Sequence, residues 1–403
     1  MEIKGFHLSY CSNIHPGESW EATFRNLKIY IPEVRSRLKH QGPFGIGLRL
    51  SHEASLVLER PEKLEEFQTW LLQANAYVFT LNGFPYGDFH RHIVKEKVHF
   101  PDWTTLERKD YTTRLFRILV QLLPPGMEGG ISTSPISYRH WFKTKEELPI
   151  AMETATQHLL EVVLELIQIR KETGKNLHLD IEPEPDGILE NSEEMIWLYT
   201  DWLLPKGKKL LAEKLGISGD EAELAIKNHI QVCYDVCHFA IVYEKPAETF
   251  AKFNAQGIQV GKIQISAALK LFIPAEAVKR ATLKRSLQPF VESTYLHQVV
   301  GRDSKGILNS YPDLPVALEK LADAQEEEWR IHFHVPVFLD NYGTFSSTQT
   351  DIITVLKEII GNPAITQHLE VETYTWEVLP EETKLSLGES ISRELAWVIT
   401  NLA

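Results

Sequence analysis

The chain has 403 residues, of which 43% are apolar and 24% are charged, a composition typical of a globular protein and not of a disordered or low-complexity chain. Its 55 acidic and 42 basic residues give a formal net charge of −13. Because proteins bind phosphate backbones through concentrated lysine and arginine, this charge argues against nucleic acid as the main partner. The short basic cluster of Lys206, Lys208 and Lys209 is expected to be a solvated helix start.

The cysteine content and the apolar runs bear on where the protein resides. Three cysteines, Cys11, Cys233 and Cys237, are too few for a disulfide framework and fit a reducing compartment. The first residues, 1–5, contain no secretory signal pattern. No apolar run approaches the ~20 residues that a membrane span needs. We therefore expect a cytoplasmic protein with no transmembrane segment.

Short apolar segments alternate with longer helical ones along the chain, as in the βαβ units of a parallel sheet. Nine segments are predicted as strands: 6–11, 44–50, 76–82, 130–134, 177–182, 230–235, 261–266, 330–337 and 368–373. Apolar residues at helical spacing predict helices at 61–73, 147–172, 193–215, 246–255, 316–328, 350–360 and 390–402.

Eight parallel strands close a (β/α)8 TIM barrel, so one of the nine predicted strands belongs to an insertion. The long gap at 267–329 is the expected place for extra structure after strand 7. A second insertion is expected after strand 3, at 83–124, where proline and aromatic residues are frequent. Because no linker separates independent domains, we predict a single α/β domain over residues 1–403.

Four of the predicted strands carry polar residues on one face. Adjacent strand residues point to opposite faces, so His178, Asp180 and Glu182 share one side of their strand. The same alternation recurs at 261–266, 331–335 and 368–372. Such a face either meets water on an open antiparallel sheet or lines the lumen of a barrel. The interleaved helices favour the barrel, whose pocket lies at the C-terminal ends of the strands.

Carboxylates end three of the nine predicted strands. Glu182 ends the fifth and Glu372 the last, while Asp235 ends the sixth and is followed three residues later by His238. Buried carboxylates are costly unless they are paired or bind a metal, and a carboxylate beside an imidazole suits Zn²⁺ or Mn²⁺. The structural alternatives are solvated or ion-paired carboxylates, a helix N-cap at Asp235 and a packed histidine at His238.

Glu182 and Glu372 are the predicted catalytic residues. Two carboxylates on opposite sides of a substrate can remove and return a proton at a carbon next to a carbonyl. A divalent metal on the neighbouring oxygens would stabilise the resulting negative charge. Glu184, in the loop after Glu182, is either a solvated carboxylate or a further functional group.

Further candidates complete the predicted site. Gln264 and His334 are candidate metal ligands, together with Glu182, Asp235, His238 and Glu372. His297 and His332 are further candidates, of which His297 is the weaker. The predicted substrate-binding residues are His15, Asn82, Tyr86, His90, His297, Tyr374 and Trp376. The aromatic stretch 82–90 either covers the pocket or packs within an insertion.

The strand-end Glu182, the Asp-x-x-His of Asp235 and His238, and the strand-end Glu372 resemble the xylose-isomerase-like TIM barrel superfamily. That group includes sugar isomerases, ketose epimerases and endonuclease IV. Three further motifs, at 8–20, 82–87 and 130–135, resemble the EboE family of metabolite traffic proteins. This second resemblance extends over nearly the whole chain.

The resemblance implies a divalent ion (Zn, Mn or Mg) held by Glu182, Asp235, a seventh-strand residue and Glu372. Where the superfamily usually has a histidine in the seventh strand, this chain has Gln264. Either His334 or His297 replaces that histidine, or the metal binds more weakly, or the activity is altered. The EboE resemblance further implies a small-molecule metabolite and other Ebo pathway proteins as partners.

Three functions follow as hypotheses. The first is a metal-dependent sugar isomerase or epimerase-like barrel that acts on a small polyhydroxylated or carbonyl metabolite in an Ebo-type pathway. The second is a non-catalytic metabolite-binding or trafficking component with a degenerate active site, which the departure at Gln264 motivates. The third, metal-dependent phosphoester hydrolysis, is disfavoured by the net charge of −13.

Overall fold

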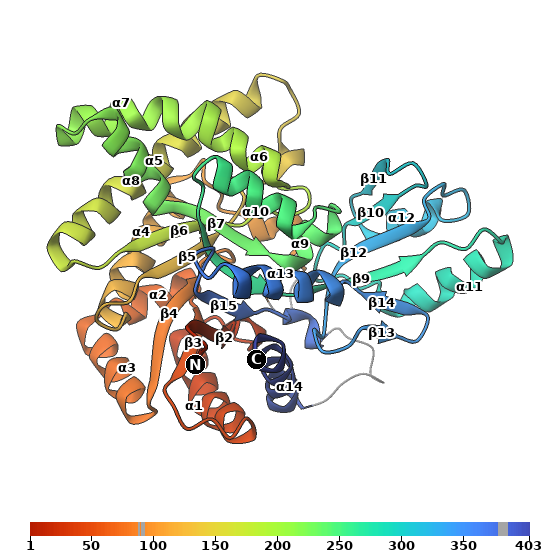
Figure 1. The fold of residues 1–403 in the computed structure, drawn as a ribbon, viewed down its shortest axis with the longest axis horizontal. Coiled ribbons are helices and arrows are strands. Elements are labelled where there is room, and N and C mark those ends of the chain that lie inside the picture. Colours follow the sequence, from red (N-terminus) through yellow and green to blue (C-terminus); the bar gives the residue numbers. More distant parts are fainter. Residues whose placement is uncertain (88, 90–92, 378–385) are drawn as a thin grey trace.

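Eight parallel strands form a closed barrel in the computed structural model, which describes residues 1–87, 89, 93–377 and 386–403 (Figure 1). The strands are β2 (Phe6–Tyr10), β3 (Phe44–Arg49), β4 (Ala76–Asn82), β5 (Gly129–Thr133), β6 (Leu177–Ile181), β7 (Ile230–Asp235), β8 (Val260–Ile265) and β15 (His368–Val371). They are hydrogen-bonded in the order β2-β15-β8-β7-β6-β5-β4-β3. A parallel bridge between Cys11 and Gly47 joins the two ends of this row. The predicted (β/α)8 barrel is therefore confirmed; the short β1 (Glu2–Ile3) adds an antiparallel edge to β2.

Helices follow the barrel strands and surround the barrel (Figure 1). They are α1 (Trp20–Arg37), α2 (His52–Leu58), α3 (Pro61–Gln73), α4 (Leu106–Leu122), α5 (Glu147–Thr173), α6 (Ser192–Trp197), the π-helical turn η4 (Leu198–Leu203), α7 (Leu204–Leu215), α8 (Gly219–His229), α9 (Val236–Ile241), α10 (Pro246–Ala255), α13 (Gln349–Gly361) and α14 (Leu387–Leu402). The segment 193–215, predicted as one helix, contains α6, η4 and α7 in succession.

A second, six-stranded antiparallel sheet is inserted between β8 and α13 and protrudes from the barrel (Figure 1). Its strands are β9 (Ala267–Phe272), β10 (Val299–Arg302), β11 (Leu308–Tyr311), β12 (Glu328–Val335), β13 (Asn341–Tyr342) and β14 (Phe345–Ser347), in the order β11-β10-β12-β9-β14-β13. The helices α11 (Ala277–Leu287) and α12 (Leu314–Lys320) accompany it. The predicted strand at 330–337 is β12, so among the nine it is the one that belongs to this insertion and not to the barrel.

Two boundaries differ from the sequence predictions. The helix predicted at 316–328 ends at Lys320. Beyond it, Glu326 accepts hydrogen bonds from Asn309 and Tyr311 of the inserted sheet. The inserted structure also continues beyond residue 329, through β14. After β4, the segment 83–124 contains the ordinary barrel helix α4, so its extra structure is the stretch before that helix, with the 3-10 turn η2 (Lys95–His99).

The barrel lumen is polar. Lys262 of β8 and Glu370 of β15 are fully buried and form an ion pair at 2.5 Å, so the polar strand faces line the interior and do not meet water. Burial alone would lower the pKa of Lys262, but the Glu370 carboxylate outweighs it and raises that pKa. Glycines on neighbouring strands make room for these groups: a Cβ on Gly47 would lie 1.9 Å from Glu370 Oε1.

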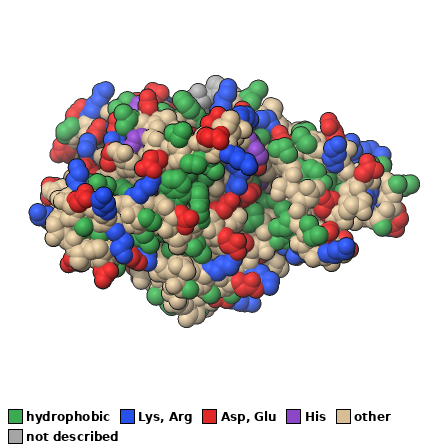
Figure 2. Space-filling model, turned by 90° about the horizontal axis from the view of Figure 1, so that it is seen from above, with side chains coloured by type: hydrophobic (Ala, Val, Ile, Leu, Met, Phe, Trp, Pro, Cys, Tyr) green, Lys and Arg blue, Asp and Glu red, His purple; other side chains and the backbone are tan. Residues whose placement is uncertain are grey.

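The outer surface mixes the two charge signs. On the face shown in Figure 2, acidic and basic side chains are interspersed around exposed hydrophobic ones. In the part of the chain that the structure describes, no helix is long and apolar enough to cross a membrane.

Candidate metal centre

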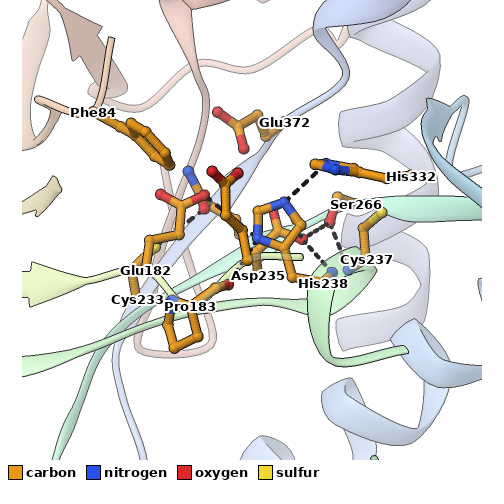
Figure 3. Close-up of polar contacts among 12 residues, drawn as sticks. Phe84, Glu182, Pro183, Cys233, Asp235, Cys237, His238, Ser266, His332 and Glu372 are labelled. Atoms are coloured by element: carbon orange, nitrogen blue, oxygen red, sulfur yellow. Dashed lines mark hydrogen bonds and ion pairs between the residues drawn. The ribbon is translucent and has the colours of Figure 1, made fainter. Parts of the chain in front are cut away.

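Three carboxylates meet at the C-terminal end of the barrel. Glu182 follows β6, Asp235 ends β7 and Glu372 follows β15. One oxygen from each lies within 4.8 Å of the others, and all three side chains are buried. Figure 3 shows the carboxylates of Glu182, Asp235 and Glu372 pointing toward one another. Three negative charges in so small a buried volume require protons or a cation.

The electrostatics of the three carboxylates are unequal. Burial, and then the charge of the neighbouring carboxylates, raises the pKa of both Glu182 and Glu372 well above the usual value. Burial also opposes the charge on Asp235, but His238, His334 and a hydrogen bond from Ser266 outweigh it and lower the pKa of Asp235. A bound divalent cation would replace the protons that the two glutamates otherwise hold.

Atoms without partners mark where such a cation fits. Among the described residues, Glu182 Oε2, Asp235 Oδ2 and His334 Nε2 are buried and have no hydrogen-bond partner. The other atoms of these groups are engaged: Ser266 Oγ donates to Asp235 Oδ1 at 2.6 Å, and His334 Nδ1 donates to the carbonyl of Glu372 at 2.8 Å. Because Nδ1 carries the hydrogen, Nε2 of His334 is a lone-pair donor, as metal binding requires.

Two amides fix the third carboxylate. Asn13, in the 3-10 turn η1 (Ser12–Ile14) after β2, donates to Glu372 Oε1 at 2.6 Å. Asn82, the last residue of β4, donates to the same oxygen at 3.0 Å. These bonds leave the second oxygen of Glu372 for a cation or a substrate proton. Outer hydrogen bonds of this kind orient metal ligands.

From the sequence, Gln264, His297 and His334 are candidates for one further metal ligand. Gln264, one residue before the end of β8, accepts a hydrogen bond from the Cys233 thiol at 3.1 Å. His297 uses both ring nitrogens, with the carbonyl of His332 at 2.7 Å and with Glu292 at 2.8 Å. His334, on the inserted strand β12, brings a ring nitrogen within 4.8 Å of Asp235 and His238. Of the three candidates, His334 is therefore the one placed to complete a metal site.

A small cavity lies against the carboxylates, with about 60 Å³ of space that the centre of a water molecule can occupy. Glu182, Glu372 and His238 line its floor, and Phe84 and Leu296 are among the apolar residues on its walls. The cavity therefore combines a charged floor with largely apolar walls, as small-molecule sites do.

The segment after β4 and the inserted sheet meet above the cavity. Val94 N donates to the carbonyl of Thr294 at 2.8 Å, and the Lys95 ammonium pairs with Asp313 at 2.6 Å. The Tyr295 hydroxyl donates to the carbonyl of Phe89 at 3.1 Å. These contacts hold the segment after β4 against the inserted sheet at the edge of the cavity.

The predicted substrate-binding residues are divided between this cavity and its surroundings. Asn82 and Tyr374 line it, whereas His15, Tyr86, His297 and Trp376 are not among the lining residues. His15 stacks on Tyr30, with 4.3 Å between ring centroids, and Tyr86 stacks on His52 at 4.6 Å. His90 lies outside the described residues.

Sequence reasoning did not single out Asn13, Ser266 or His99. Ser266 lies two residues beyond Gln264, on the same strand face, so the alternation that identified Gln264 also identifies it. Asn13 follows the first strand at the end where barrel sites form. His99 belongs to an irregular segment, where no periodic pattern indicates the direction of a side chain.

Comparison with known proteins leaves the family open. No family model matches the chain, and no curated protein matches it. Similar solved structures include a xylose-isomerase-like TIM barrel protein from Mycobacterium smegmatis in complex with magnesium (10% identity, TM-score 0.47, 93% of this chain and 88% of that chain). Another is the IolI protein with a bound zinc atom (12% identity, TM-score 0.45, 98% of this chain and 98% of that chain). A third is a D-tagatose 3-epimerase-like protein (10% identity, TM-score 0.48, 98% of this chain and 97% of that chain). With identities of 10–12% and TM-scores below 0.5, these similarities concern the fold alone and say nothing about the reaction.

Proposed function

We propose that this chain is a metal-dependent isomerase or epimerase-like enzyme that acts on a small polyhydroxylated or carbonyl metabolite. The observation that carries the proposal is the meeting of Glu182, Asp235 and Glu372 beside a small cavity, with His334 close to Asp235. Glu182, Asp235 and His334 each have a buried atom without a hydrogen-bond partner. The cation would be Zn²⁺, Mn²⁺ or Mg²⁺. The resemblance to the EboE family supports an Ebo-type pathway, pathway proteins as partners and a cytoplasmic location.

The two glutamates supply the proton chemistry. Glu182 and Glu372 both line the cavity and come from different strands, so one carboxylate can act as the general base and the other, when protonated, as the general acid. One takes a proton from a carbon beside a carbonyl, and the other delivers a proton to the opposite face or to the neighbouring carbon. The divalent ion, when bound, supplies charge stabilisation at the substrate oxygens.

The proposal is tested by hydrogen exchange at carbon. The protein, reconstituted with Mn²⁺ or Zn²⁺, is incubated in D₂O with a panel of ketopentoses, ketohexoses and cyclic ketopolyols and followed by NMR. We expect deuterium at the carbon beside the carbonyl of at least one compound. Exchange should fall by at least 10²-fold in Glu182→Gln, which removes the base, and should be unchanged in Glu190→Gln, a glutamate paired with Arg139 outside the cavity.

The second candidate function is a binding or trafficking component without turnover. It is favoured by Gln264, which occupies the seventh strand and is already engaged by Cys233. This function predicts that compounds of the panel raise the melting temperature of the metal-loaded protein while none of them exchanges hydrogen. That combination of results would reject the enzyme.

A further inference from the structure

Two imidazole nitrogens face each other beside the carboxylates. His238, in α9, and His332, on β12, approach with 3.1 Å between their Nε2 atoms, and the rings are nearly perpendicular, at 83° (Figure 3). Both side chains are buried. The carboxylate centre described above does not include His332.

The hydrogen positions on both rings follow from their other contacts. His238 Nδ1 lies 3.0 Å from the carbonyl of Pro183, which can only accept, so Nδ1 carries the hydrogen. His332 Nδ1 lies 2.8 Å from Oε1 of Gln298, whose Nε2 donates to the carbonyl of Pro185 at 3.1 Å. The orientation of that amide makes His332 Nδ1 a donor as well. In the neutral rings, both Nε2 atoms therefore present lone pairs to each other, and a positive species must lie at this point.

The geometry suits a shared metal ion. Two imidazole nitrogens bound to one Zn²⁺ at about 2.0–2.1 Å each lie roughly 3.3–3.4 Å apart at the tetrahedral angle, and a separation of 3.1 Å corresponds to an N–Zn–N angle of about 98°. Each ring also donates its remaining N–H to a carbonyl or amide oxygen, the outer contact that metal-binding histidines characteristically make. Both features are present on both rings.

A carboxylate completes the group. Glu184 places an oxygen within 4.8 Å of the ring nitrogens of His238 and His332, and its side chain is buried. His99 Nε2 lies 2.9 Å from Glu184 Oε1, so that oxygen has an orienting partner. The three ligands come from the loop after β6, from α9 and from the inserted sheet, and they line the same cavity as Glu182 and Glu372.

We propose that His238, His332 and Glu184 bind a second divalent cation of the Zn²⁺ class, next to the carboxylate site of Glu182, Asp235 and Glu372. The two positions differ in chemistry, because imidazole nitrogens favour Zn²⁺ whereas carboxylates also accept Mn²⁺ and Mg²⁺. The second site does not depend on the proposed reaction, since its ligands would hold a cation in a binding protein equally well. The competing explanation is an additional proton shared between the two rings.

The experiment measures how many metal ions each chain holds. Chelator-stripped protein is dialysed against excess Zn²⁺, and bound zinc is counted by elemental analysis for wild type, His332→Gln, Glu182→Gln and the double variant. We expect two zinc ions in wild type, one in each single variant and none in the double variant. The control is His158→Gln, a buried histidine that bonds the Trp103 carbonyl in another part of the barrel wall, and it should retain two.

The outcomes separate this inference from the proposed function. One zinc ion in wild type, lost in Glu182→Gln and retained in His332→Gln, overturns the second site and leaves the carboxylate site standing. One zinc ion lost in His332→Gln and retained in Glu182→Gln supports the second site and removes the metal from the proposed reaction. If His332→Gln does not fold, an anomalous difference map of wild-type crystals at the zinc edge decides: density between His238 and His332 supports the site, and its absence at saturating zinc overturns it.

One neighbouring group tests the ligand assignment. Cys237 offers a thiol within 4.8 Å of ring nitrogens of His332 and His334, so it is an alternative ligand for the same ion. We expect Cys237→Ser to retain two zinc ions with unchanged affinity. Loss of one ion in that variant would overturn the assignment of Glu184 and His238.

Discussion

At the scale of single residues, the position of Glu372 depends on two amides that are far from it in sequence. Asn13 and Asn82 both donate to Oε1, so this oxygen is committed and the other is available to the site. Without these bonds the carboxylate would rotate, and the free energy of metal binding would fall through lost preorganisation.

We predict that Asn82→Ala weakens divalent-metal binding by about 10- to 100-fold, the usual effect of removing an outer-shell partner. Isothermal titration of the stripped protein with Mn²⁺ measures it. Asn176→Ala, at the opposite end of the barrel where its amide bonds Glu128, should leave the affinity unchanged. Equal affinity in Asn82→Ala and wild type would show that Asn82 does not position the ligand.

The residue scale also shows what sequence can predict. Glu182, Asp235 and Glu372 could be identified because each ends a predicted strand, and the barrel brings strand ends together. Asn13 was not identified, because small polar residues after a strand have many ordinary roles in turns and caps. The interaction of His238 with His332 joins residues 94 positions apart and depends on the packing of two separate sheets.

At the scale of elements, the β12 strand was predicted as a strand but its sheet was not. The alternation of His332 and His334 with apolar residues gives the strand and its polar face, but the same pattern fits a barrel strand or an antiparallel one. Pairing partners decide between them, and β12 pairs with β9 and β10 through contacts that no local pattern records. The polar face nonetheless meets the barrel mouth.

Strand β8 illustrates how the lumen accommodates charge. A Cβ on Gly261 would lie 1.9 Å from Asp180 Oδ1, and Asp180 is held in place by His178 at 2.6 Å. We predict that Gly261→Ala destabilises the protein by about 1–3 kcal/mol or more, as overpacking of a core does. Denaturant unfolding measures the change.

A matched glycine provides the comparison for this substitution. At Gly219, in the first turn of α8, the nearest atom to an added Cβ is Lys208 Cε at 3.5 Å, an ordinary contact. Gly219→Ala should therefore leave the free energy of unfolding within about 0.5 kcal/mol of wild type, as surface substitutions do. If Gly261→Ala behaves in the same way, the lumen is less tightly packed than these distances indicate.

At the scale of the whole molecule, helix α14 connects the end of the barrel to the inserted sheet through one buried acid. Glu394 accepts hydrogen bonds from Val337 N at 3.2 Å and from the Thr373 hydroxyl at 2.7 Å. Burial raises the pKa of Glu394 to about 8. Between the ordinary glutamate pKa of about 4.3 and that value, the folded state binds more protons than the unfolded state, so stability declines as pH rises.

We predict that wild type loses stability between pH 5 and pH 9 relative to Glu394→Gln, whose neutral amide has no proton to release. The melting temperatures of the two proteins should therefore diverge by several degrees toward pH 9, with the variant higher. Glu389→Gln, on the same helix, should follow the wild-type profile. Parallel profiles for wild type and Glu394→Gln would show that Glu394 does not titrate in this range.

The fold as a whole was predictable because the alternation of strand and helix repeats around the barrel, and eight repeats close it. The extent of the insertions was less so. The acidic run after Lys320 fits the outer face of a helix, yet Glu326 is used by Asn309 and Tyr311 of β11. Whether such a segment continues a helix or packs against a distant sheet depends on tertiary contacts, and these cannot be read from a single sequence.

The origin of His334 on the inserted strand has a consequence for assembly of the molecule. A cation held by Asp235 and His334 would be a coordination cross-link between two sheets that otherwise meet through packing and hydrogen bonds. Withdrawing it should loosen the appended sheet while the cylinder stays folded, so amide hydrogen exchange in β12 should accelerate in chelator-treated protein while β5 remains protected. The availability of the metal would then determine both whether the protein is active and how firmly the inserted sheet is held against the barrel.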